Sequence, residues 1–568
     1  MFTSMNRAGI QRLIHDILKN THHRLWYVVG WTSLNAVTST LGIALILPLL
    51  SLIFPISGTE RLHLGWINLN WLTLERMLLL YIVLVSISVW INRQTLIQTT
   101  ILVQRYTKFL RIRLFETLFS SDYHYIARQK KSNILNQFTM EIARISISVT
   151  ALISMISGIL ITIPHLVLAW YISPRLTGFV FVSGIVVFVS LYTSLRRVRQ
   201  LALSLSDSNQ RWQQRLHEQL YGVKEIRSYG IEARQTDAFR QATEEIEQNL
   251  IQYATEQSKP DVVFKIVAAS LISFFFYVSL AIFDEEIGTL LVIVLLFARL
   301  WPLFTAFQKN MQLFLSGLSV YTDLQAALDH IPKSIQAEEY LLPFQKSIEL
   351  NRVSFSYTGA EMSGLQDVSL TIHSGQMIAI MGASGTGKST LLDLLLGLLE
   401  PQTGEIRIDG QVLKQEKTES WRKQISYIPQ SAFLFHGTIR QNIAHFHPGL
   451  TEEELLEALE LAGATFVHEL PDGLETIIGD FGARLSGGQQ QKIILARALA
   501  KRPRLLLFDE ATNAMDREQE VLFHKTLRHL TKRMTIVYIT HRIEIGRLAD
   551  AIYHIETGRL EVKEGSHS

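Results

Sequence analysis

Eight residues from Gly382 to Ser389 carry the clearest chemistry in this 568-residue chain. They fit the phosphate-binding pattern G-x-x-x-x-G-K-[ST], with an apolar, strand-like run before them and a Leu-rich, helix-like run after them. Glycines let backbone N–H groups approach phosphate oxygens, Lys388 can reach the β- and γ-phosphates, and the Ser389 hydroxyl can bind Mg²⁺. The pattern predicts a nucleoside triphosphate site made of Gly382, Ala383, Ser384, Gly385, Thr386, Gly387, Lys388, Ser389 and Thr390.

A second motif further along the chain supplies the acidic groups that such a site needs. Leu505 to Phe508 is an apolar run that ends in Asp509 and Glu510. A buried parallel strand would deliver both carboxylates to the phosphate edge of a sheet. We expect Asp509 to hold Mg²⁺ through water and Glu510 to polarise the attacking water.

The run Leu485-Ser486-Gly487-Gly488-Gln489 points to a family. With the two motifs above, it makes the sequence resemble the ATP-binding cassette (ABC) transporters, and the resemblance covers nearly the whole chain. It implies a half-transporter of the exporter type, in which six membrane spans precede one ATP-hydrolysing domain. The cofactors that it implies are ATP and Mg²⁺.

The resemblance also assigns single residues to the site. It implies that Tyr357 stacks on adenine, that Gln430 contacts Mg²⁺ or water, and that His541 contacts the γ-phosphate. The expected catalytic set is Glu510, His541, Lys388 and Gln430. The expected Mg²⁺ set is Ser389, Gln430 and Asp509. A further set is implied to act on ATP held by a second chain: Ser486, Gly487, Gly488, Gln489 and Asp516.

Two chains are therefore expected to work together. Because Glu510, His541 and the LSGGQ run are all intact, two identical chains can form two competent sites. This favours a homodimer, with pairing to a different half-transporter left as the alternative.

The elements that position these residues fall into two groups. Hydrophobic residues make up 48% of the chain, and they concentrate before about Leu318 in long uncharged runs of the kind that a bilayer requires. We expect a membrane α-helical domain with long cytoplasmic extensions, followed by an α/β P-loop ATPase domain. The six expected spans cover residues 25–54, 77–102, 145–171, 176–195, 266–283 and 287–311.

The expected domains are an interfacial helix at 1–24, a transmembrane domain at 25–328, a linker at 329–346 and a nucleotide-binding domain at 347–568. Lys and Arg gather before the first span, after the second and after the fourth, which places those segments and both termini in the cytoplasm. The opening residues have no secretory apolar segment before Leu25 and predict a basic amphipathic helix along the membrane. A multi-pass protein of the inner (plasma) membrane is expected if the source is bacterial.

Two long polar connections join the expected spans. Residues 121–133 and 222–226 fall at the bottoms of these connections, where a soluble domain could press on them. The alternative is that they are solvated helical turns.

Three cations fall within or near the expected spans. Arg299 lies near the middle of the bilayer, whereas Arg93 and Lys265 lie nearer the cytoplasmic leaflet. They suggest a cationic cavity for an anionic substrate, such as a lipid-linked saccharide, an acidic peptide or a siderophore-like metabolite. The alternative is snorkelling or an interhelical hydrogen bond.

The expected function is ATP-driven export from the cytoplasm or the inner leaflet by alternating access in a dimer. A flippase for a lipid-linked substrate and an exporter-shaped siderophore importer are the alternatives. Hydropathy disfavours a soluble cassette protein, and the absence of cysteine excludes disulfides, thiolate metal sites and a cysteine peptidase. With a net charge of only +3, nucleic acid is not an expected partner. The expected partners are a second half-transporter, membrane lipid and the unidentified substrate.

Overall fold

The chain forms two compact units. One, the helical unit, comprises Met1–Ser120 and Arg128–Ile331, and the other, the α/β unit, comprises Ser121–Ala127 and Pro332–Ser568. The computed structural model describes residues 5–21, 24–45, 63–64, 67–68, 73–172, 174, 177–178, 192–281, 287–331, 342–357, 364–479, 482–510, 523, 526–531, 533–541 and 548–563.

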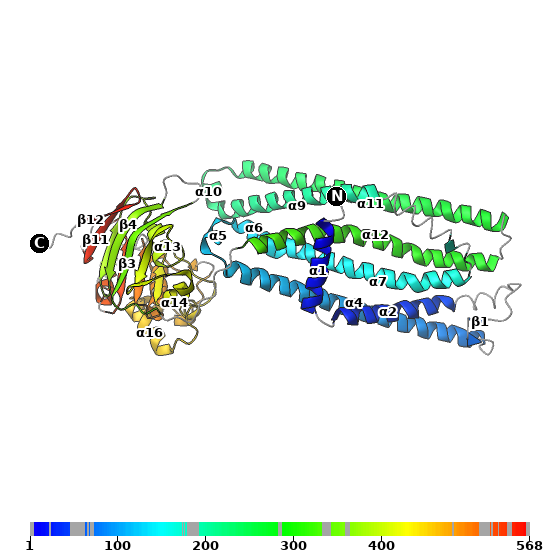
Figure 1. The fold of residues 1–568 in the computed structure, drawn as a ribbon, viewed down its shortest axis with the longest axis horizontal. Coiled ribbons are helices and arrows are strands. Elements are labelled where there is room, and N and C mark those ends of the chain that lie inside the picture. The colour runs from blue at the N-terminus through cyan, green and yellow to red at the C-terminus, as the bar shows by residue number, and fades with distance from the viewer. Residues whose placement is uncertain are drawn as a thin grey trace. The chain divides into compact units, whose positions relative to one another are not determined.

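Helices, most of them long, make up most of the described part of the helical unit (Figure 1). They are α1 (Met5–Thr21), α2 (Arg24–Ala44), α4 (Leu74–Phe119), α6 (Lys131–Asn136), α7 (Ile142–Ile172), α9 (Tyr192–Tyr221), α10 (Val223–Ser228), α11 (Glu232–Ala281) and α12 (Ile287–His330). A π-helical turn, Gln137–Glu141, joins α6 to α7, and a short hairpin pairs β1 (His63–Leu64) with β2 (Ile67–Asn68).

Among the described residues, two stretches are long and apolar enough to cross a membrane, Leu74–Phe119 and Lys131–Tyr171. The helices continue well past the expected spans. α4 extends to Phe119, where the prediction from hydropathy stops at residue 102, because the polar residues that follow remain helical. Most of the expected span at 176–195 lies outside the described residues.

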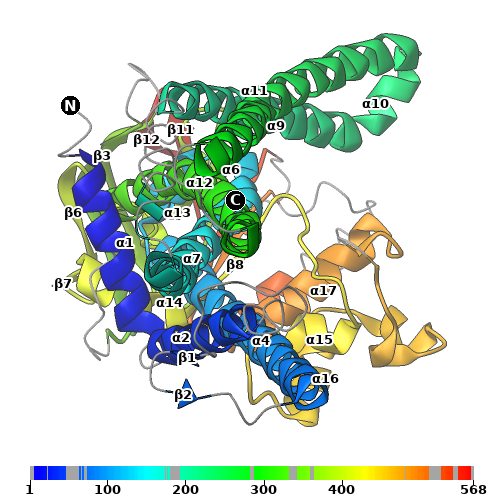
Figure 2. The same ribbon diagram turned by 90° about the vertical axis from the view of Figure 1, so that its right-hand side faces the viewer.

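Inside the helical unit, α9 and α11 lie side by side and are joined through α10 (Figures 1 and 2). α7 and α12 also pack against each other, and they approach closely at Gly317. A Cβ atom on Gly317 would lie 2.4 Å from the Ser148 Cβ and 2.8 Å from the Arg144 carbonyl oxygen. The Ser148 hydroxyl donates to the Phe314 carbonyl oxygen at 2.9 Å, so the two backbones meet here with almost nothing between them.

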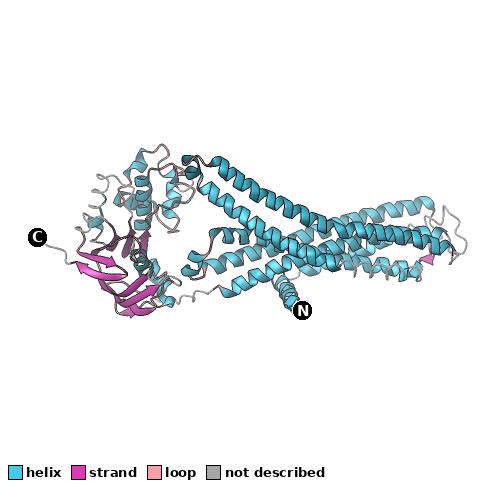
Figure 3. Ribbon diagram, turned by 90° about the horizontal axis from the view of Figure 1, so that it is seen from above, coloured by secondary structure: helices cyan, strands magenta, loops and turns pink. Residues whose placement is uncertain are grey.

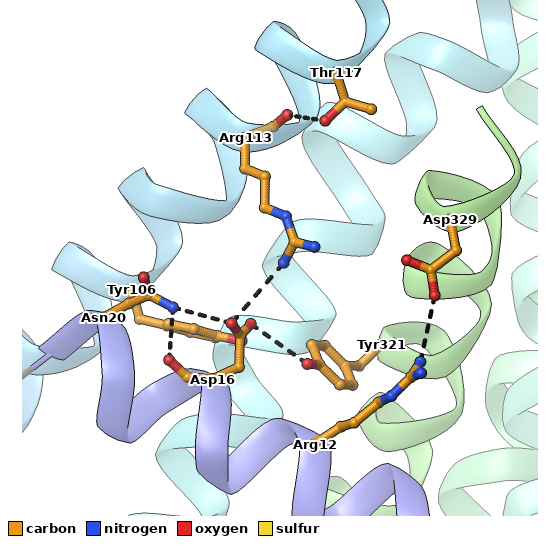
Figure 4. A network of polar contacts seen from close by, with 8 residues as sticks. All are labelled: Arg12, Asp16, Asn20, Tyr106, Arg113, Thr117, Tyr321 and Asp329. Carbon is orange, nitrogen blue, oxygen red and sulfur yellow. Dashed lines mark hydrogen bonds and ion pairs between the residues drawn. The ribbon is translucent and has the colours of Figure 1, made fainter. Parts of the chain in front are cut away.

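The N-terminal helix α1 is fastened to α4 and α12 through Asp16 (Figure 4). Its carboxylate accepts hydrogen bonds from the hydroxyls of Tyr106 at 2.8 Å and Tyr321 at 3.4 Å, and it pairs with Arg113 at 3.9 Å. Tyr106 is 1% exposed, so its hydroxyl donates to this carboxylate from a buried position. Leu13 and Ile17 on the same face of α1 are fully or almost fully buried.

The α/β unit contains two sheets, which hold the strands outside the β1–β2 hairpin (Figure 3). The larger has the order β12-β11-β5-β10-β9-β8, and it is parallel except for the β11–β12 pair. Its strands are β5 (Met377–Met381), β8 (Ile425–Ile428), β9 (Leu505–Asp509), β10 (Thr535–Ile539), β11 (Ala551–Glu556) and β12 (Arg559–Lys563). The smaller sheet is antiparallel and consists of β4 (Gly364–His373), β3 (Ser347–Ser356), β6 (Thr403–Ile408) and β7 (Gln411–Val412).

Helices cover these sheets. They are α13 (Lys388–Leu395), α14 (Thr418–Lys423), α15 (Ile439–Ala444), α16 (Glu452–Leu461) and α17 (Gly487–Ala500), with short 3-10 turns at Gln415–Lys417, Thr465–Glu469 and Gly473–Glu475. The central strands β5, β9 and β10 are buried on both faces, as expected of parallel strands between helices. The segment Ser121–Ala127, which includes most of α5 (Tyr123–Arg128), belongs to this unit, so this part of the first long connection does contact the soluble domain.

Candidate nucleotide-binding site

Four parallel strands bring the predicted residues to one edge of the larger sheet. The register pairs Ile380 with Ile539, Ile539 with Asp509, and Ile428 with Phe508. The residues that follow these strand ends therefore gather at the carboxyl edge, where open α/β sheets bind ligands. They are Gly382 after β5, Gln430 after β8, Glu510 after β9 and His541 after β10.

The loop after β5 needs glycine where it turns. Gly382 has φ 155° and Gly387 has φ 106°, and both values are unfavourable for residues with a side chain. A Cβ on Gly382 would lie 2.4 Å from the Ile555 carbonyl oxygen, and one on Gly387 would lie 2.9 Å from the Gly364 carbonyl oxygen. Gly387 then caps α13, so the loop curls around the N-terminus of a helix. This arrangement suits phosphate, because free N–H groups and the helix dipole point at the bound anion.

Lys388 lies inside the curl of this loop. Its ammonium group donates to the carbonyl oxygens of Gly382 at 2.9 Å and Ala383 at 2.8 Å, and its side chain is 6% exposed. Burial lowers the pKa of Lys388, although the nearby charges of Glu510 and Asp509 oppose this effect. The cation is therefore held where phosphate oxygens would enter the loop.

Glu510 is the most constrained acid of the site. Its carboxylate accepts a hydrogen bond from the Gln430 side-chain amide at 2.9 Å, contacts His541, and lies 3.9 Å from the Lys388 ammonium group. The backbone N–H of Glu510 donates to the Ile539 carbonyl oxygen at 3.2 Å. The structure therefore brings together all four residues of the predicted catalytic set.

The predicted Mg²⁺ ligands fit that metal chemically. The set offers hydroxyl, amide and carboxylate oxygens, which Mg²⁺ prefers. Asp509 accepts a hydrogen bond from the Tyr427 hydroxyl at 3.3 Å, and burial raises the pKa of Asp509 while that bond opposes the rise. The Ser389 side chain is exposed at the start of α13. In the part of the chain that the structure describes, no group of three or more acidic or histidine residues is placed to hold a metal ion.

The LSGGQ run forms the N-terminus of α17. Ser486 caps the helix: its hydroxyl oxygen accepts from the Gln489 N–H at 3.3 Å, and the Gln489 side chain accepts from the Ser486 N–H at 2.9 Å. Gln490, next along the chain, donates to the carbonyl oxygens of Gly482 and Leu485 and so fixes the loop that precedes the helix. Ser486 and Gly487 are exposed, and the Ser486 hydroxyl proton is left to donate outward.

Tyr357 follows β3 and contacts α13, the helix that begins at the phosphate loop. The Thr390 hydroxyl donates to the Tyr357 hydroxyl oxygen at 3.5 Å. Asp516 lies outside the described residues. The motifs did not point to two further residues near the site, Tyr427 and His124. Tyr427 carried a signal, because it lies three residues before Gln430 in the sequence, whereas nothing in the spacing of the sequence singles out His124.

The three predicted substrate cations lie on long helices of the helical unit. Arg93 is on α4 and Lys265 on α11, and both side chains are exposed. Arg299 is on α12, and its side chain lies outside the described ones. The predicted cationic cavity therefore stays a prediction.

Sequence comparison matches both parts of the chain to known families. The family described as "ABC transporter transmembrane region" matches residues 25–302, and the family described as "ABC transporter" matches residues 365–513.

Curated relatives align over most of the chain. One is the "Heterocyst differentiation ATP-binding protein HepA" of Nostoc sp., which is 30% identical over 81% of this chain and 76% of that protein. Another is the "ATP-dependent lipid A-core flippase" of Photorhabdus laumondii, which is 29% identical over 94% of this chain and 91% of that protein. The flippase of the same name from Pectobacterium atrosepticum is 29% identical over 81% of this chain and 80% of that protein.

A solved structure shares the fold. It is that of a bacterial Atm1-family ABC exporter with ATP bound, with a TM-score of 0.77 and 20% identity, and the match covers 98% of this chain and 95% of that one.

Proposed function

This chain belongs to the ATP-binding cassette transporter family as an exporter-type half-transporter, and from that premise we propose that two identical copies of it move an anionic, lipid-linked substrate across the membrane. The chain is a multi-pass membrane protein whose ATP hydrolysis drives export, and half-transporters of this family function as dimers. The substrate, the identity of the partner and the orientation of the termini are parts of the proposal.

The observation that carries the substrate class is the set of relatives. Seven relatives at 28% or 29% identity are named lipid A-core flippases, and they come from several bacterial genera. A flippase moves a molecule whose tails stay in the bilayer while its polar headgroup crosses. Arg93, Lys265 and Arg299 support an anionic headgroup, because a cation within a membrane span is costly unless it meets a polar partner.

The residues at the sheet edge take defined roles in this proposal. The loop after β5 and Lys388 bind the β- and γ-phosphates, and Ser389 and Asp509 hold Mg²⁺, which neutralises phosphate charge when bound. Glu510 accepts a proton from the attacking water. Gln430 and His541 orient the Glu510 carboxylate, which both of them contact. Tyr357 stacks on adenine.

The second copy completes each site. Ser486, Gly487, Gly488 and Gln489 at the N-terminus of α17 donate to the γ-phosphate held by the other copy, with Asp516 beside them. ATP shifts the pair toward the closed arrangement only because it binds that arrangement more tightly. Hydrolysis removes the bridging γ-phosphate, and the open arrangement returns.

Both termini face the cytoplasm in this proposal. Arg12, Lys19 and Arg24 precede the first span, and further basic residues follow the second. ATP is supplied on that side, so a substrate moved outward enters from the cytoplasmic leaflet.

Mass spectrometry of the molecules that copurify with the chain in lipid nanodiscs tests the substrate class. We expect a lipid-linked saccharide or another anionic lipid to be enriched over an unrelated membrane protein prepared identically. Arg299→Ala should lose this enrichment, whereas Arg240→Ala, at an exposed site on α11 paired with Asp237, should keep it. An enriched peptide or water-soluble metabolite would overturn the lipid-linked substrate.

A transport assay in proteoliposomes tests the direction. The enriched lipid, carrying a fluorescent headgroup, should move away from the ATP-facing leaflet only when ATP is present. Movement toward that leaflet would identify an importer.

A further inference from the structure

A short helix of the first long connection lies against the nucleotide-binding domain. Asp122 directly precedes α5, and its carboxylate accepts from the His124 N–H at 3.1 Å. The Asp122 carbonyl oxygen also accepts from the N–H groups of Tyr125 at 3.1 Å and Ile126 at 3.4 Å. Such local bonds hold the first turn of a helix in place. The backbone of His124 is therefore fixed within the α/β unit.

The imidazole ring of His124 packs on Tyr357. The two rings are nearly parallel, with 29° between their planes and 5.7 Å between their centroids. His124 also meets Phe355 edge-on at 6.3 Å, and Phe355 meets Tyr357 edge-on at 5.1 Å. Phe355 is 8% exposed in β3, so Tyr357 packs against one buried ring and against the ring of His124.

Tyr357 is also connected to the helix of the phosphate loop. Its hydroxyl oxygen accepts from Thr390 at 3.5 Å, the residue that follows Ser389. α5 lies near the same helix, since the Asp393 charge adds to the effect of burial in raising the pKa of Tyr123. One residue each from α5, β3 and α13 thus contacts Tyr357.

We propose that His124 is a positioning residue for Tyr357, which it holds in the rotamer that receives the base of the nucleotide. The inference rests on the proposed adenine-stacking role of Tyr357. It adds to that role a residue that lies outside the nucleotide-binding domain expected from the sequence, residues 347–568. A tyrosine ring that is already ordered loses less side-chain entropy when a base stacks on it. His124 belongs to the first long polar connection, residues 121–133. Recognition of the base therefore depends on this connection as well as on the nucleotide-binding domain.

The chemistry predicts a selective effect. The ring of His124 contributes to binding of the base and not to binding of the phosphates, which the loop after β5 holds. Loss of this ring should weaken the binding of ATP and leave the binding of inorganic tripolyphosphate unchanged. An aromatic pair contributes enough to change the dissociation constant for ATP about two- to tenfold.

Equilibrium binding to the full-length chain in nanodiscs tests this inference. Displacement of a fluorescent ATP analogue by ATP and by tripolyphosphate is measured without Mg²⁺, so that hydrolysis does not proceed. His124→Ala should raise the dissociation constant for ATP about two- to tenfold and leave that for tripolyphosphate unchanged. His124→Phe, which keeps a ring, should restore the affinity for ATP. Lys130→Ala, at an exposed position of the same connection, should leave both affinities unchanged.

Tyr357→Ala separates this inference from the proposed function. If Tyr357→Ala leaves the affinity for ATP unchanged, the adenine-stacking role is wrong. If Tyr357→Ala weakens the binding of ATP and His124→Ala does not, only the role of His124 is overturned. The role of His124 is also overturned if His124→Ala weakens the binding of ATP and of tripolyphosphate equally. Failure of His124→Phe to restore the binding of ATP would overturn it as well. In the double variant, the loss should not exceed that of Tyr357→Ala alone.

Discussion

Glu510 combines a strained backbone with a crowded carboxylate. Its φ of 48° is in the left-handed region, which costs a residue with a side chain about 1 to 2 kcal/mol. The chain turns there directly after the buried strand β9, and Gln430, Lys388 and His541 all contact the side chain. The strain is thus located at the acid proposed to accept the proton, and the surrounding contacts hold it in one orientation.

Replacement of this acid should separate binding from hydrolysis. Glu510→Gln keeps the shape of the side chain but cannot accept a proton, so we expect ATP hydrolysis to fall at least about 100-fold. The affinity for ATP should remain, because the phosphate loop is unchanged. Phosphate release and equilibrium binding measure the two effects, with Glu561→Gln at an exposed position of β12 as the control. Hydrolysis by Glu510→Gln at the rate of the unaltered protein would show that Glu510 does not accept the proton of the attacking water.

A second carboxyl group makes stability depend on pH. Burial and then the Asp509 charge raise the pKa of Asp393 to about 6, from an ordinary value of 3.8. The folded chain therefore holds this proton more tightly than the unfolded chain. The stability that this provides is complete below about pH 4 and is lost as the pH rises through about 6.

Asp393→Asn should therefore stabilise the protein most at neutral pH. We expect a gain of about 1 to 3 kcal/mol at pH 7.5, with solvent screening favouring the lower end, and a smaller gain at pH 4.5. Thermal unfolding in nanodiscs at the two pH values measures the difference. Glu400→Gln, at an exposed position, is the matched control. An equal gain at both pH values would contradict the titration of Asp393.

Motifs and packing contribute differently to what a sequence can predict about the site. The glycine-lysine loop and the acid pair predict which residues lie at the ends of β5 and β9, because strand ends in a parallel sheet share one edge. The contact between His124 and Tyr357 joins two segments far apart in the chain through ring packing alone. No spacing rule encodes such a contact, so only the structure reveals it.

At the scale of elements, the partly buried carboxylate of Asp16 helps to hold α1 in its position. Asp16→Ala removes the acceptor for Tyr106 and Tyr321 and leaves Arg113 without its partner on α1. We expect a loss of about 1 to 3 kcal/mol and faster trypsin cleavage within α1. Thermal unfolding and limited proteolysis measure both effects.

The matched control for Asp16 is on the same helix. Arg12 pairs with Asp329 at 3.4 Å, but the two side chains are 68% and 54% exposed. Exposed pairs contribute about 1 kcal/mol or less, so Arg12→Ala should change little. Equal effects of the two substitutions would show that Asp16 does not anchor α1.

The crossing of α7 and α12 leaves no room for a side chain at Gly317. Gly317→Ala places a methyl group 2.4 Å from the Ser148 Cβ, and overpacking of this kind costs about 1 to 3 kcal/mol. Gly158→Ala on α7, where a Cβ meets nothing within 4 Å, should be neutral or slightly stabilising. Thermal unfolding compares the two variants. Equal free energies of unfolding for the Gly317→Ala and Gly158→Ala variants would show that α7 and α12 can move apart to admit the methyl group without loss of stability.

Hydropathy predicts where apolar helices occur, but it does not predict which helices touch. The expected span 145–171 lies inside α7, since long uncharged runs are easily found. The meeting of α7 with α12 depends on Gly317 and Ser148, which are small residues without a hydropathy signal.

At the scale of the whole molecule, the proposed shared sites predict complementation between two defective chains. One chain carries Glu510→Gln and the other Ser486→Arg, so each homodimer has two defective sites. In the mixed dimer, both defects fall in one site and the other site is intact if LSGGQ acts on the partner's ATP. We expect hydrolysis by the mixed dimer, purified through two different tags. Lack of hydrolysis there would contradict sites shared between chains.

The family and the order of the domains follow from motifs and hydropathy, because nucleotide chemistry requires fixed residue types. The substrate does not follow, because lipid headgroups are recognised by surfaces assembled from several helices. Arg93 and Lys265 illustrate this, since they are exposed on different helices and the chain positions alone do not say what they face.

The close approach at Gly317 has a mechanical consequence for α12. His330, at the end of the helix, lies 13 residues from Gly317, and Pro302 lies 15 residues from it in the other direction. At 1.5 Å per residue, about 20 Å of helix lies on each side of the contact at Gly317. Pro302 lacks an N–H group and is a natural joint. A rigid tilt of α12 about the contact at Gly317 would therefore move His330 and Pro302 by similar distances in opposite directions.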